Sequence, residues 1–389
     1  MVKIKIPYGR QSINEIDISA VSSTLISDRL TQGPKVKEFE DKVAAYCGAQ
    51  YAVAVSSGTA ALHLACLAAG LEAGGELWTS PNTFVASANC AIYCNAIPDF
   101  VDIDPRTYNL SVDVLEAKLS KGKEEGTLPK IIIPVHFAGQ SCEMERIQCL
   151  SEKYNFTVIE DASHAIGGKY KGSKIGSCKY SDMTVFSFHP VKIMTTGEGG
   201  MVLTNRKNLY EKLILLRSHG ITRNPDDMEG EYHGPWYYQQ VELGFNYRIT
   251  DIQAALGLSQ LKRLDEFVER RNYLAARYDE KLKDLPLTLP WQHPDVYSSV
   301  HLYVIRIKRQ ALSKNRFQVF KELIKAGIGV NVHYIPVHIQ PYYKKLGFKE
   351  GDFPEAEHYY QEAISLPIFY ELIEKDQNYV VRTLQKALS

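Results

Sequence analysis

The sequence predicts an α/β protein with a large, mainly parallel sheet domain and a smaller C-terminal α+β domain. Short apolar, β-rich runs alternate with helix-like segments as far as residue 249. Such alternation is typical of a parallel sheet that helices cover on both faces. From Thr250 the pattern changes to a long stretch rich in Leu, Ala, Arg and Glu, which favours a connecting helix. We therefore divide the chain into domains 1–249 and 250–389.

The same patterns assign the elements in chain order. The strands expected in the large domain are Tyr51–Val55, Pro98–Ile103, Lys130–Val135, Phe156–Ile159, Met183–Phe188 and Met201–Thr204. The helices expected between them include Thr59–Ala69, Thr83–Tyr93, Glu143–Tyr154 and Asn208–Arg217. In the small domain we expect strands at His301–Ile307 and Ile328–His333 and helices at Phe317–Ala326 and Glu374–Ala387.

Charge and composition exclude several classes of protein. Among 389 residues, 45 Lys and Arg balance 45 Asp and Glu, which argues against a general binder of nucleic acid or anionic membranes. No uninterrupted apolar stretch reaches the ~20 residues of a membrane-spanning helix. Charges and a proline near the N-terminus argue against an export signal. The 7 cysteines include no C-x-x-C pair, so we expect a cytoplasmic protein without a disulfide framework or a metal site.

The segment Ser56–Thr59 follows a predicted strand and opens a predicted helix. Backbone amides at a helix N-terminus, beside Ser57, Gly58 and Thr59, can bind an anion such as a phosphate. The plainer interpretation is an ordinary helix N-cap. Neither a G-x-x-x-x-G-K-[ST] nor a G-x-G-x-x-G pattern follows any predicted strand, so nucleoside triphosphates and dinucleotides are poor candidates for the ligand.

Three further side chains stand at turns of this pattern. Asp161 ends an apolar strand, where its carboxylate could hold a protonated ring nitrogen or simply cap the next turn. Lys192 follows a buried strand beside a glycine-rich turn and is a candidate Schiff-base residue, unless it is an ordinary surface lysine. Phe84 is either a core residue or a stacking partner for a flat ring. A phosphate site, a stacking ring, an aspartate and a lysine together match pyridoxal phosphate.

At this level of detail the sequence resembles the DegT/DnrJ/EryC1/StrS family of nucleotide-sugar aminotransferases. The likeness runs over nearly the whole chain and includes SSGTAALHLA, EDASHAIGG, FSFHPVKIMTTGEGG, GFNYRITDIQAALGLSQL and VNVHYIPVH. The resemblance implies the aspartate aminotransferase-like architecture, fold type I of the pyridoxal-phosphate-dependent transferases. It also implies a homodimer with active sites at the interface.

The resemblance further implies roles for residues at matching positions. Lys192 would form the Schiff base with the cofactor, and Asp161 would pair with its pyridine nitrogen. The other cofactor contacts would come from Ser57, Gly58, Thr59, Phe84, His164, Ser187 and, reaching over from the neighbouring subunit, Asn246. The sugar nucleotide would contact Tyr8, Asp28, Arg29, Leu30, Thr31, His333 and Tyr334.

The segments IPYGR, SHGITR and HYIPVHIQPYY are similar to the branch of the family that serves pseudaminic acid biosynthesis. This likeness implies L-glutamate as donor and UDP-2-acetamido-2,6-dideoxy-β-L-arabino-hexos-4-ulose as acceptor. The D-xylo epimer or another nucleotide-linked keto sugar remains an alternative acceptor.

The reaction class also has alternatives: a sugar dehydratase, an aminotransferase for amino acids, and a non-catalytic pyridoxal phosphate sensor. Some relatives that dehydrate sugars have histidine at the position of Lys192, so the lysine favours transamination. The segment 223–241 cannot be placed from motifs.

Overall fold

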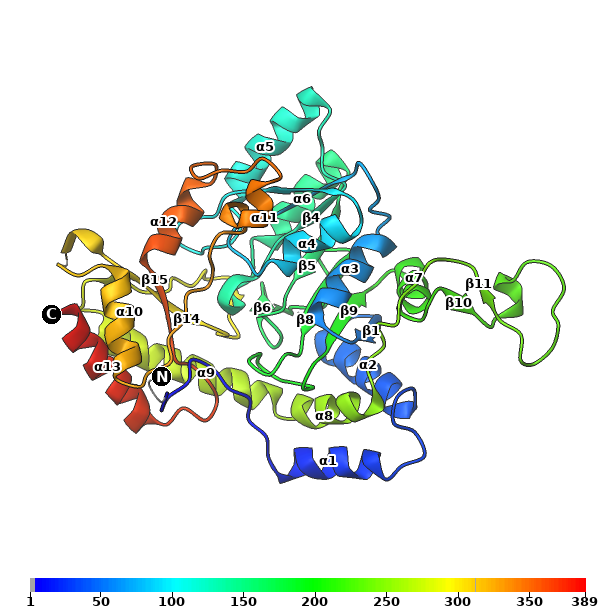
Figure 1. Ribbon diagram of the computed structural model, residues 1–389, viewed down its shortest axis with the longest axis horizontal. Coiled ribbons are helices and arrows are strands. Elements are labelled where there is room, and N and C mark those ends of the chain that lie inside the picture. The colour runs from blue at the N-terminus through cyan, green and yellow to red at the C-terminus, as the bar shows by residue number, and fades with distance from the viewer. Residues whose placement is uncertain (1–3, 312) are drawn as a thin grey trace.

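The computed structural model describes residues 4–311 and 313–389 and is built around a seven-stranded sheet (Figure 1). The strand order is β1-β9-β8-β5-β4-β2-β3, and only β9 runs antiparallel to its neighbours. The strands are β1 (Tyr51–Val55), β2 (Glu76–Thr79), β3 (Ile97–Phe100), β4 (Ile131–Ile133), β5 (Thr157–Asp161), β8 (Met183–Ser187) and β9 (Gly200–Thr204). Residues 1–3, which belong to the segment where we predict no export signal, lie outside the described residues.

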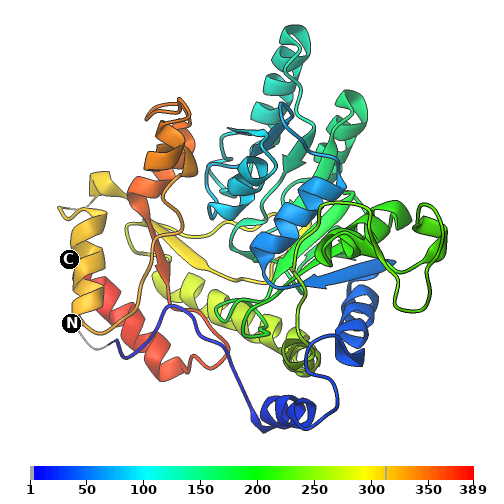
Figure 2. The same cartoon turned by 45° about the vertical axis from the view of Figure 1, so that its right-hand side comes forward.

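Helices cover both faces of this sheet, as the sequence predicts (Figure 2). Side chains at alternate strand positions face opposite sides, so Val53 and Val55 join one core while Ala52 and Ala54 join another. The first face is covered by α3 (Gly58–Ala68), α4 (Ala86–Tyr93) and α7 (Lys207–Arg217). The second is covered by α2 (Pro34–Cys47), α5 (Val112–Glu125), α6 (Met144–Tyr154), α8 (Asp251–Leu261) and α9 (Leu264–Leu282).

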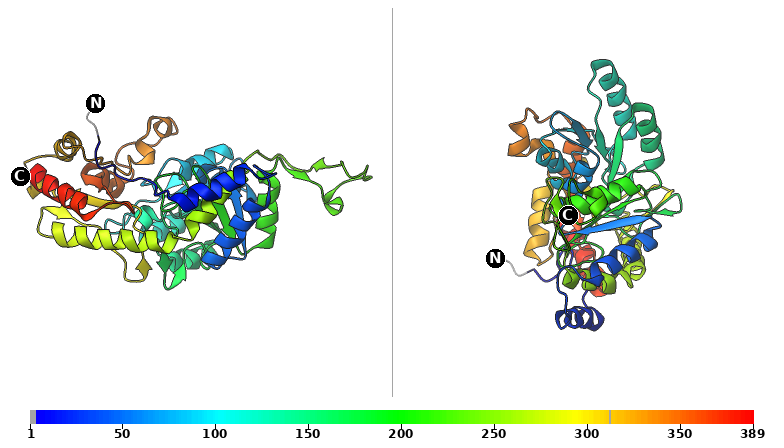
Figure 3. Two further views of the ribbon diagram at one scale, coloured as in Figure 1. Left: turned by 90° about the horizontal axis from the view of Figure 1, so that it is seen from below. Right: turned by 90° about the vertical axis from the view of Figure 1, so that its right-hand side faces the viewer.

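A second, smaller sheet lies at the end of the molecule that holds the C-terminus (Figure 3). Its antiparallel strands are β12 (Leu287–Thr288), β14 (Tyr303–Ile307) and β15 (Ala363–Leu366). The helices α10 (Arg316–Lys325) and α13 (Glu374–Leu388) pack with the end of α9 on this sheet. Ile6 near the N-terminus belongs to the same core, so the N-terminal segment reaches across to the small sheet. The division of the chain at residue 250 stays a prediction.

Two sequence expectations about the C-terminal part are wrong. Residues 328–333 form no continuous strand, because Ile328 bridges to Ile6 whereas Asn331 bridges to Ser365 of β15. The long helix expected from Thr250 divides into α8 and α9 at Arg263, whose backbone leaves helical geometry. The Arg263 guanidinium donates to the buried Asp17 carboxylate at 2.6 Å, which ties this break to α1 (Glu15–Leu25).

The remaining elements are short or peripheral. They are α1 (Glu15–Leu25), β6 (Lys169–Tyr170), β7 (Ser173–Lys174), β10 (Ile221–Thr222), β11 (Gln239–Gln240), β13 (Val296–Tyr297), α11 (Pro341–Lys344) and α12 (Pro354–Glu362). Single 3-10 turns occur at Phe137–Gly139, Pro225–Asp227, Arg309–Ala311 and Val337–Ile339. Strands β10 and β11 form a hairpin whose loop, within segment 223–241, projects from the body (Figures 1 and 3). Within the described ranges, no helix combines the length and apolar character needed to span a bilayer.

Candidate active site

A cavity of about 680 Å³ opens where β1, β5 and β8 end and α3 begins. These three strands point the same way, so their carboxyl ends meet at one edge of the sheet, where α/β proteins bind ligands. Eleven of the residues singled out in the sequence line this cavity: Tyr8, Ser57, Gly58, Thr59, Phe84, Asp161, His164, Ser187, Lys192, His333 and Tyr334.

Five other candidates lie elsewhere in this chain. Asn246 is exposed and does not line the cavity. Asp28 and Arg29 line a separate cavity of about 690 Å³ between α1, α2 and α8, while Leu30 and Thr31 line neither. The segment 223–241, in the hairpin, also contributes no side chain to its own chain's cavity. The contact of Asn246 with the cofactor and those of residues 28–31 with the substrate stay predictions.

The N-terminal end of α3 forms one wall of the cavity. Ser57 is the N-cap of α3, and its hydroxyl accepts a hydrogen bond from the Ala60 amide at 3.1 Å. This serine therefore also acts as an ordinary helix N-cap. Strands β8 and β9 pack closely against the turn between β1 and α3. A Cβ atom added to Gly58 would lie 2.9 Å from Cβ of Ser187. A Cβ atom added to Gly200, in β9, would lie 2.3 Å from the Ser57 carbonyl oxygen. The glycines therefore leave room at a helix N-terminus, where free amides favour an anion.

Lys192 lies on the turn after β8, with its side chain in the cavity. Burial disfavours the charged amine and lowers the pKa of Lys192 to about 8, against the opposing attraction of Asp161. An amine with this pKa is partly neutral near pH 7, and a neutral amine can attack an aldehyde or accept a proton.

The Asp161 carboxylate is held by two serines that the sequence interpretation missed. Its Oδ1 accepts hydrogen bonds from the Ser163 amide at 3.1 Å and from the Ser163 hydroxyl at 2.6 Å. Its Oδ2 accepts from the hydroxyl of Ser87, on α4, at 2.6 Å. The EDASHA motif contains Ser163 and could have indicated it, whereas Ser87 lies 74 positions away, and its contact with Asp161 cannot be inferred from the sequence.

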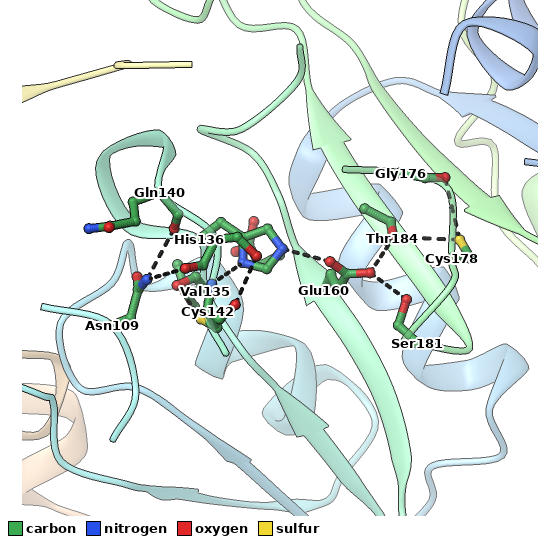
Figure 4. Close-up of polar contacts among 12 residues, drawn as sticks. Asn109, Val135, His136, Gln140, Cys142, Glu160, Gly176, Cys178, Ser181 and Thr184 are labelled. Carbon is green, nitrogen blue, oxygen red and sulfur yellow. Dashed lines mark hydrogen bonds and ion pairs between the residues drawn. The ribbon is translucent and has the colours of Figure 1, made fainter. Parts of the chain in front are cut away.

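Glu160, next to Asp161 in β5, points to the opposite side of the sheet and does not line the cavity. One of its oxygens lies 2.6 Å from His136 Nε2, and the other accepts from Ser181 at 2.5 Å and Thr184 at 2.9 Å (Figure 4). Burial opposes the charge, but the hydrogen bonds from His136, Ser181 and Thr184 outweigh it and lower the pKa of Glu160. This buried carboxylate links β5, which carries Asp161, to β8, the strand that Lys192 follows.

Imidazole rings line another wall of the cavity. His164 and His301 lie with ring centroids 4.3 Å apart, and Nε2 of His164 lies 3.1 Å from the Tyr334 hydroxyl. Burial, with a contribution from nearby Lys192, lowers the pKa of His164 and His301, and lowers the pKa of His333 to about 3. All three rings are therefore neutral at pH 7. Nδ1 of His164 is buried without a partner in the described part of the chain.

These groups fit pyridoxal phosphate. The helix N-terminus can hold the phosphate, Asp161 has an acceptor position left for a ring N–H, and Lys192 can bind the aldehyde. A flat ring in the cavity can contact two side chains on its wall. Phe84 has 57% of its surface exposed, and Nδ1 of His164 has no partner among the described residues. The fold and the site define a pyridoxal-phosphate-dependent transferase of fold type I.

The family assignment follows from comparison with known proteins. The DegT/DnrJ/EryC1/StrS aminotransferase family matches residues 11–385, and the chain belongs to this family. It is 40% identical to the UDP-4-amino-4,6-dideoxy-N-acetyl-beta-L-altrosamine transaminase of Campylobacter jejuni, over 97% of this chain and 96% of that protein.

Solved structures agree with this assignment. Helicobacter pylori PseC, an aminotransferase of pseudoaminic acid biosynthesis, superposes with a TM-score of 0.89 at 32% identity, covering 98% of this chain and 99% of that one. The PLP form of a sugar aminotransferase from Streptococcus pneumoniae gives 0.87 at 30% identity, over 99% and 100% of the two chains. The expected fold, enzyme class and cofactor are thereby confirmed: the chain is a pyridoxal-phosphate-dependent aminotransferase.

Proposed function

We propose that this enzyme transfers the amino group of L-glutamate to the C4 keto group of a UDP-linked 4-keto-6-deoxy-N-acetylhexosamine. The acceptor that we propose is the β-L-arabino epimer, which would place the enzyme in pseudaminic acid biosynthesis. The observation that carries the reaction type is the meeting of Lys192, Asp161 and the α3 N-terminus in one cavity. The choice of sugar is supported by the names of the Campylobacter and Helicobacter proteins.

In this proposal Lys192 is the acid and base of the reaction. Pyridoxal phosphate, when bound, supplies a ring that accepts negative charge from the carbon that loses its proton. Lys192 Nζ takes the proton from Cα of the donor and later returns a proton to the sugar carbon in the reverse sequence of steps. With a pKa of about 8, roughly one tenth of the free amine is neutral at pH 7, so the same group can accept and donate a proton.

Asp161 holds the positive charge of the ring nitrogen, which keeps the ring a good electron acceptor. Ser57, Gly58, Thr59 and Ser187 hold the phosphate. Phe84 and His164 contact the ring, and Tyr8, His333 and Tyr334 line the space left for the sugar.

In the homodimer that we propose, Asn246 reaches the cofactor phosphate of the neighbouring subunit, and the segment Asp28–Thr31 contacts the sugar nucleotide. None of these residues lines the cavity that holds Lys192 in their own chain. Gel filtration that gave only a monomer would contradict this assignment of Asn246.

A single-turnover spectrum tests the proposal. L-glutamate should convert the bound cofactor to its amino form, with loss of the visible absorption band. After removal of the donor, the L-arabino and D-xylo epimers of the UDP-linked 4-keto sugar are added to separate samples. We expect the L-arabino epimer to restore the band much faster.

Each other outcome has a definite meaning. If glutamate leaves the band unchanged, glutamate is not the donor. If the D-xylo epimer is faster, the enzyme is a sister 4-aminotransferase. If neither keto sugars nor keto acids are turned over while the cofactor stays bound, the non-catalytic sensor is favoured over the aminotransferase. Lys192→Ala, which still offers the other cofactor contacts, should retain the cofactor without turnover.

A further inference from the structure

The Asp161 carboxylate is clamped by serines from two different parts of the chain. Ser163 follows it by two positions and donates to Oδ1 through both its amide and its hydroxyl. Ser87 comes from α4 and donates to Oδ2 at 2.6 Å. The Ser87 hydroxyl also lies 2.8 Å from the Thr83 hydroxyl and 3.3 Å from the Phe84 carbonyl oxygen, and its shortest contact is the one to the carboxylate. The carboxylate is thus fixed from both sides.

A count of acceptor positions shows what this clamp leaves open. An ionised carboxylate has about four lone-pair positions, two on each oxygen. The two donors from Ser163 occupy both positions on Oδ1, and Ser87 occupies one position on Oδ2. Among the described residues, none fills the last position on Oδ2. Asp161, Ser87 and Ser163 all line the cavity, so a donor bound there can reach it.

We propose that Ser87 and Ser163 are positioning residues, which orient Asp161 so that its last free acceptor position meets the ring N–H of the bound cofactor. This inference rests on the proposed pairing of Asp161 with the ring nitrogen. Ser87 has the larger effect, because it is the sole protein donor to Oδ2 in the described structure. Loss of the Ser163 hydroxyl leaves the Ser163 amide in place on Oδ1.

The test compares two probes on the apoprotein. One is pyridoxal phosphate, and the other is 1-deazapyridoxal phosphate, in which a C–H replaces the ring nitrogen. The readout is the ratio of their dissociation constants, measured by absorbance titration. Changes in packing or solvation that affect both probes alike cancel in this ratio, whereas the orientation of Asp161 matters only to the probe that has a ring N–H.

We expect Ser87→Ala to reduce the preference for pyridoxal phosphate about tenfold, in keeping with the strength of charge-assisted hydrogen bonds. Ser163→Ala should reduce it about threefold. The matched control is Ser181→Ala, which removes a hydroxyl from the neighbouring carboxylate, Glu160, on the other side of the sheet. The preference should be unchanged in this control.

Asp161→Ala separates this inference from the proposed function. If Asp161→Ala keeps the preference for pyridoxal phosphate, the pairing of Asp161 with the ring nitrogen is wrong. If it loses the preference while Ser87→Ala and Ser163→Ala both keep it, the pairing stands and the clamp is refuted. A higher preference in Ser87→Ala also refutes the clamp, because the hydroxyl would then compete with the ring for Oδ2.

Discussion

Raising the pH towards 8 should accelerate the capture of pyridoxal phosphate by the apoprotein, since only the neutral amine of Lys192 attacks the aldehyde. With a pKa of about 8, about one amine in eleven is neutral at pH 7. At the ordinary lysine pKa of 10.5 the neutral fraction would be about one in three thousand. At pH 7 the neutral fraction of Lys192 is therefore about 300 times that of an exposed lysine, because burial in the cavity disfavours the charged amine.

Stopped-flow absorbance of apoprotein mixed with pyridoxal phosphate measures this effect. The cofactor also titrates, so each rate is divided by the rate of N-acetyl-lysine amide in the same buffer. Below pH 8 both amines gain neutral fraction equally, so this ratio should stay constant. Above pH 8 only the exposed amine continues to gain, and the ratio should fall about tenfold per pH unit towards pH 10.5.

A ratio that stayed constant up to pH 10.5 would refute this reasoning, because it would mean that the amine is solvated like a surface lysine. Asp161→Asn supplies a second test. The negative charge of Asp161 favours the protonated amine, so its removal should move the break in the ratio below pH 8. A break that moved upward would contradict the geometry that places both groups in one cavity.

Three further changes have expected outcomes. Lys192→Met should stabilise the apoprotein by about 3 kcal/mol at pH 7, because the pKa of Lys192 in the folded protein, near 8, lies below its value in the unfolded chain. This gain in stability should fade towards pH 10.5, and urea unfolding at pH 7 and pH 10.5 measures it. Gly58→Ala should weaken cofactor binding at least ~tenfold in absorbance titrations, because its Cβ would lie 2.9 Å from Cβ of Ser187. Glu40→Ala should cost about 3–5 kcal/mol in urea unfolding, since it leaves the buried Arg217 without its carboxylate partner; a cost below ~1 kcal/mol would be that of a surface pair.

The fold class and many of the residues that line the cavity could be predicted from the sequence alone. The alternation of apolar and helical segments reflects which residues are buried, and this can be read locally along the chain. The predicted strand Tyr51–Val55, for example, agrees with β1 at both ends. Because parallel strands present their carboxyl ends at one edge, Asp161 and Lys192 could be expected to meet, and they line the same cavity. The family likeness added residues such as Tyr8, whose place in the cavity no strand or helix pattern indicates.

Only the packing of distant segments shows which side chains hold Asp161 and Glu160 in place. Ser87 reaches Asp161 across 74 positions, and His136 reaches Glu160 across 24, so no local pattern could reveal either contact. The expected strand at 328–333 was lost because its backbone finds two different partners, and the pKa of Lys192 depends on a cavity formed by distant segments. Periodicity in a sequence records which residues are buried, whereas hydrogen bonding and desolvation depend on the neighbours that packing supplies.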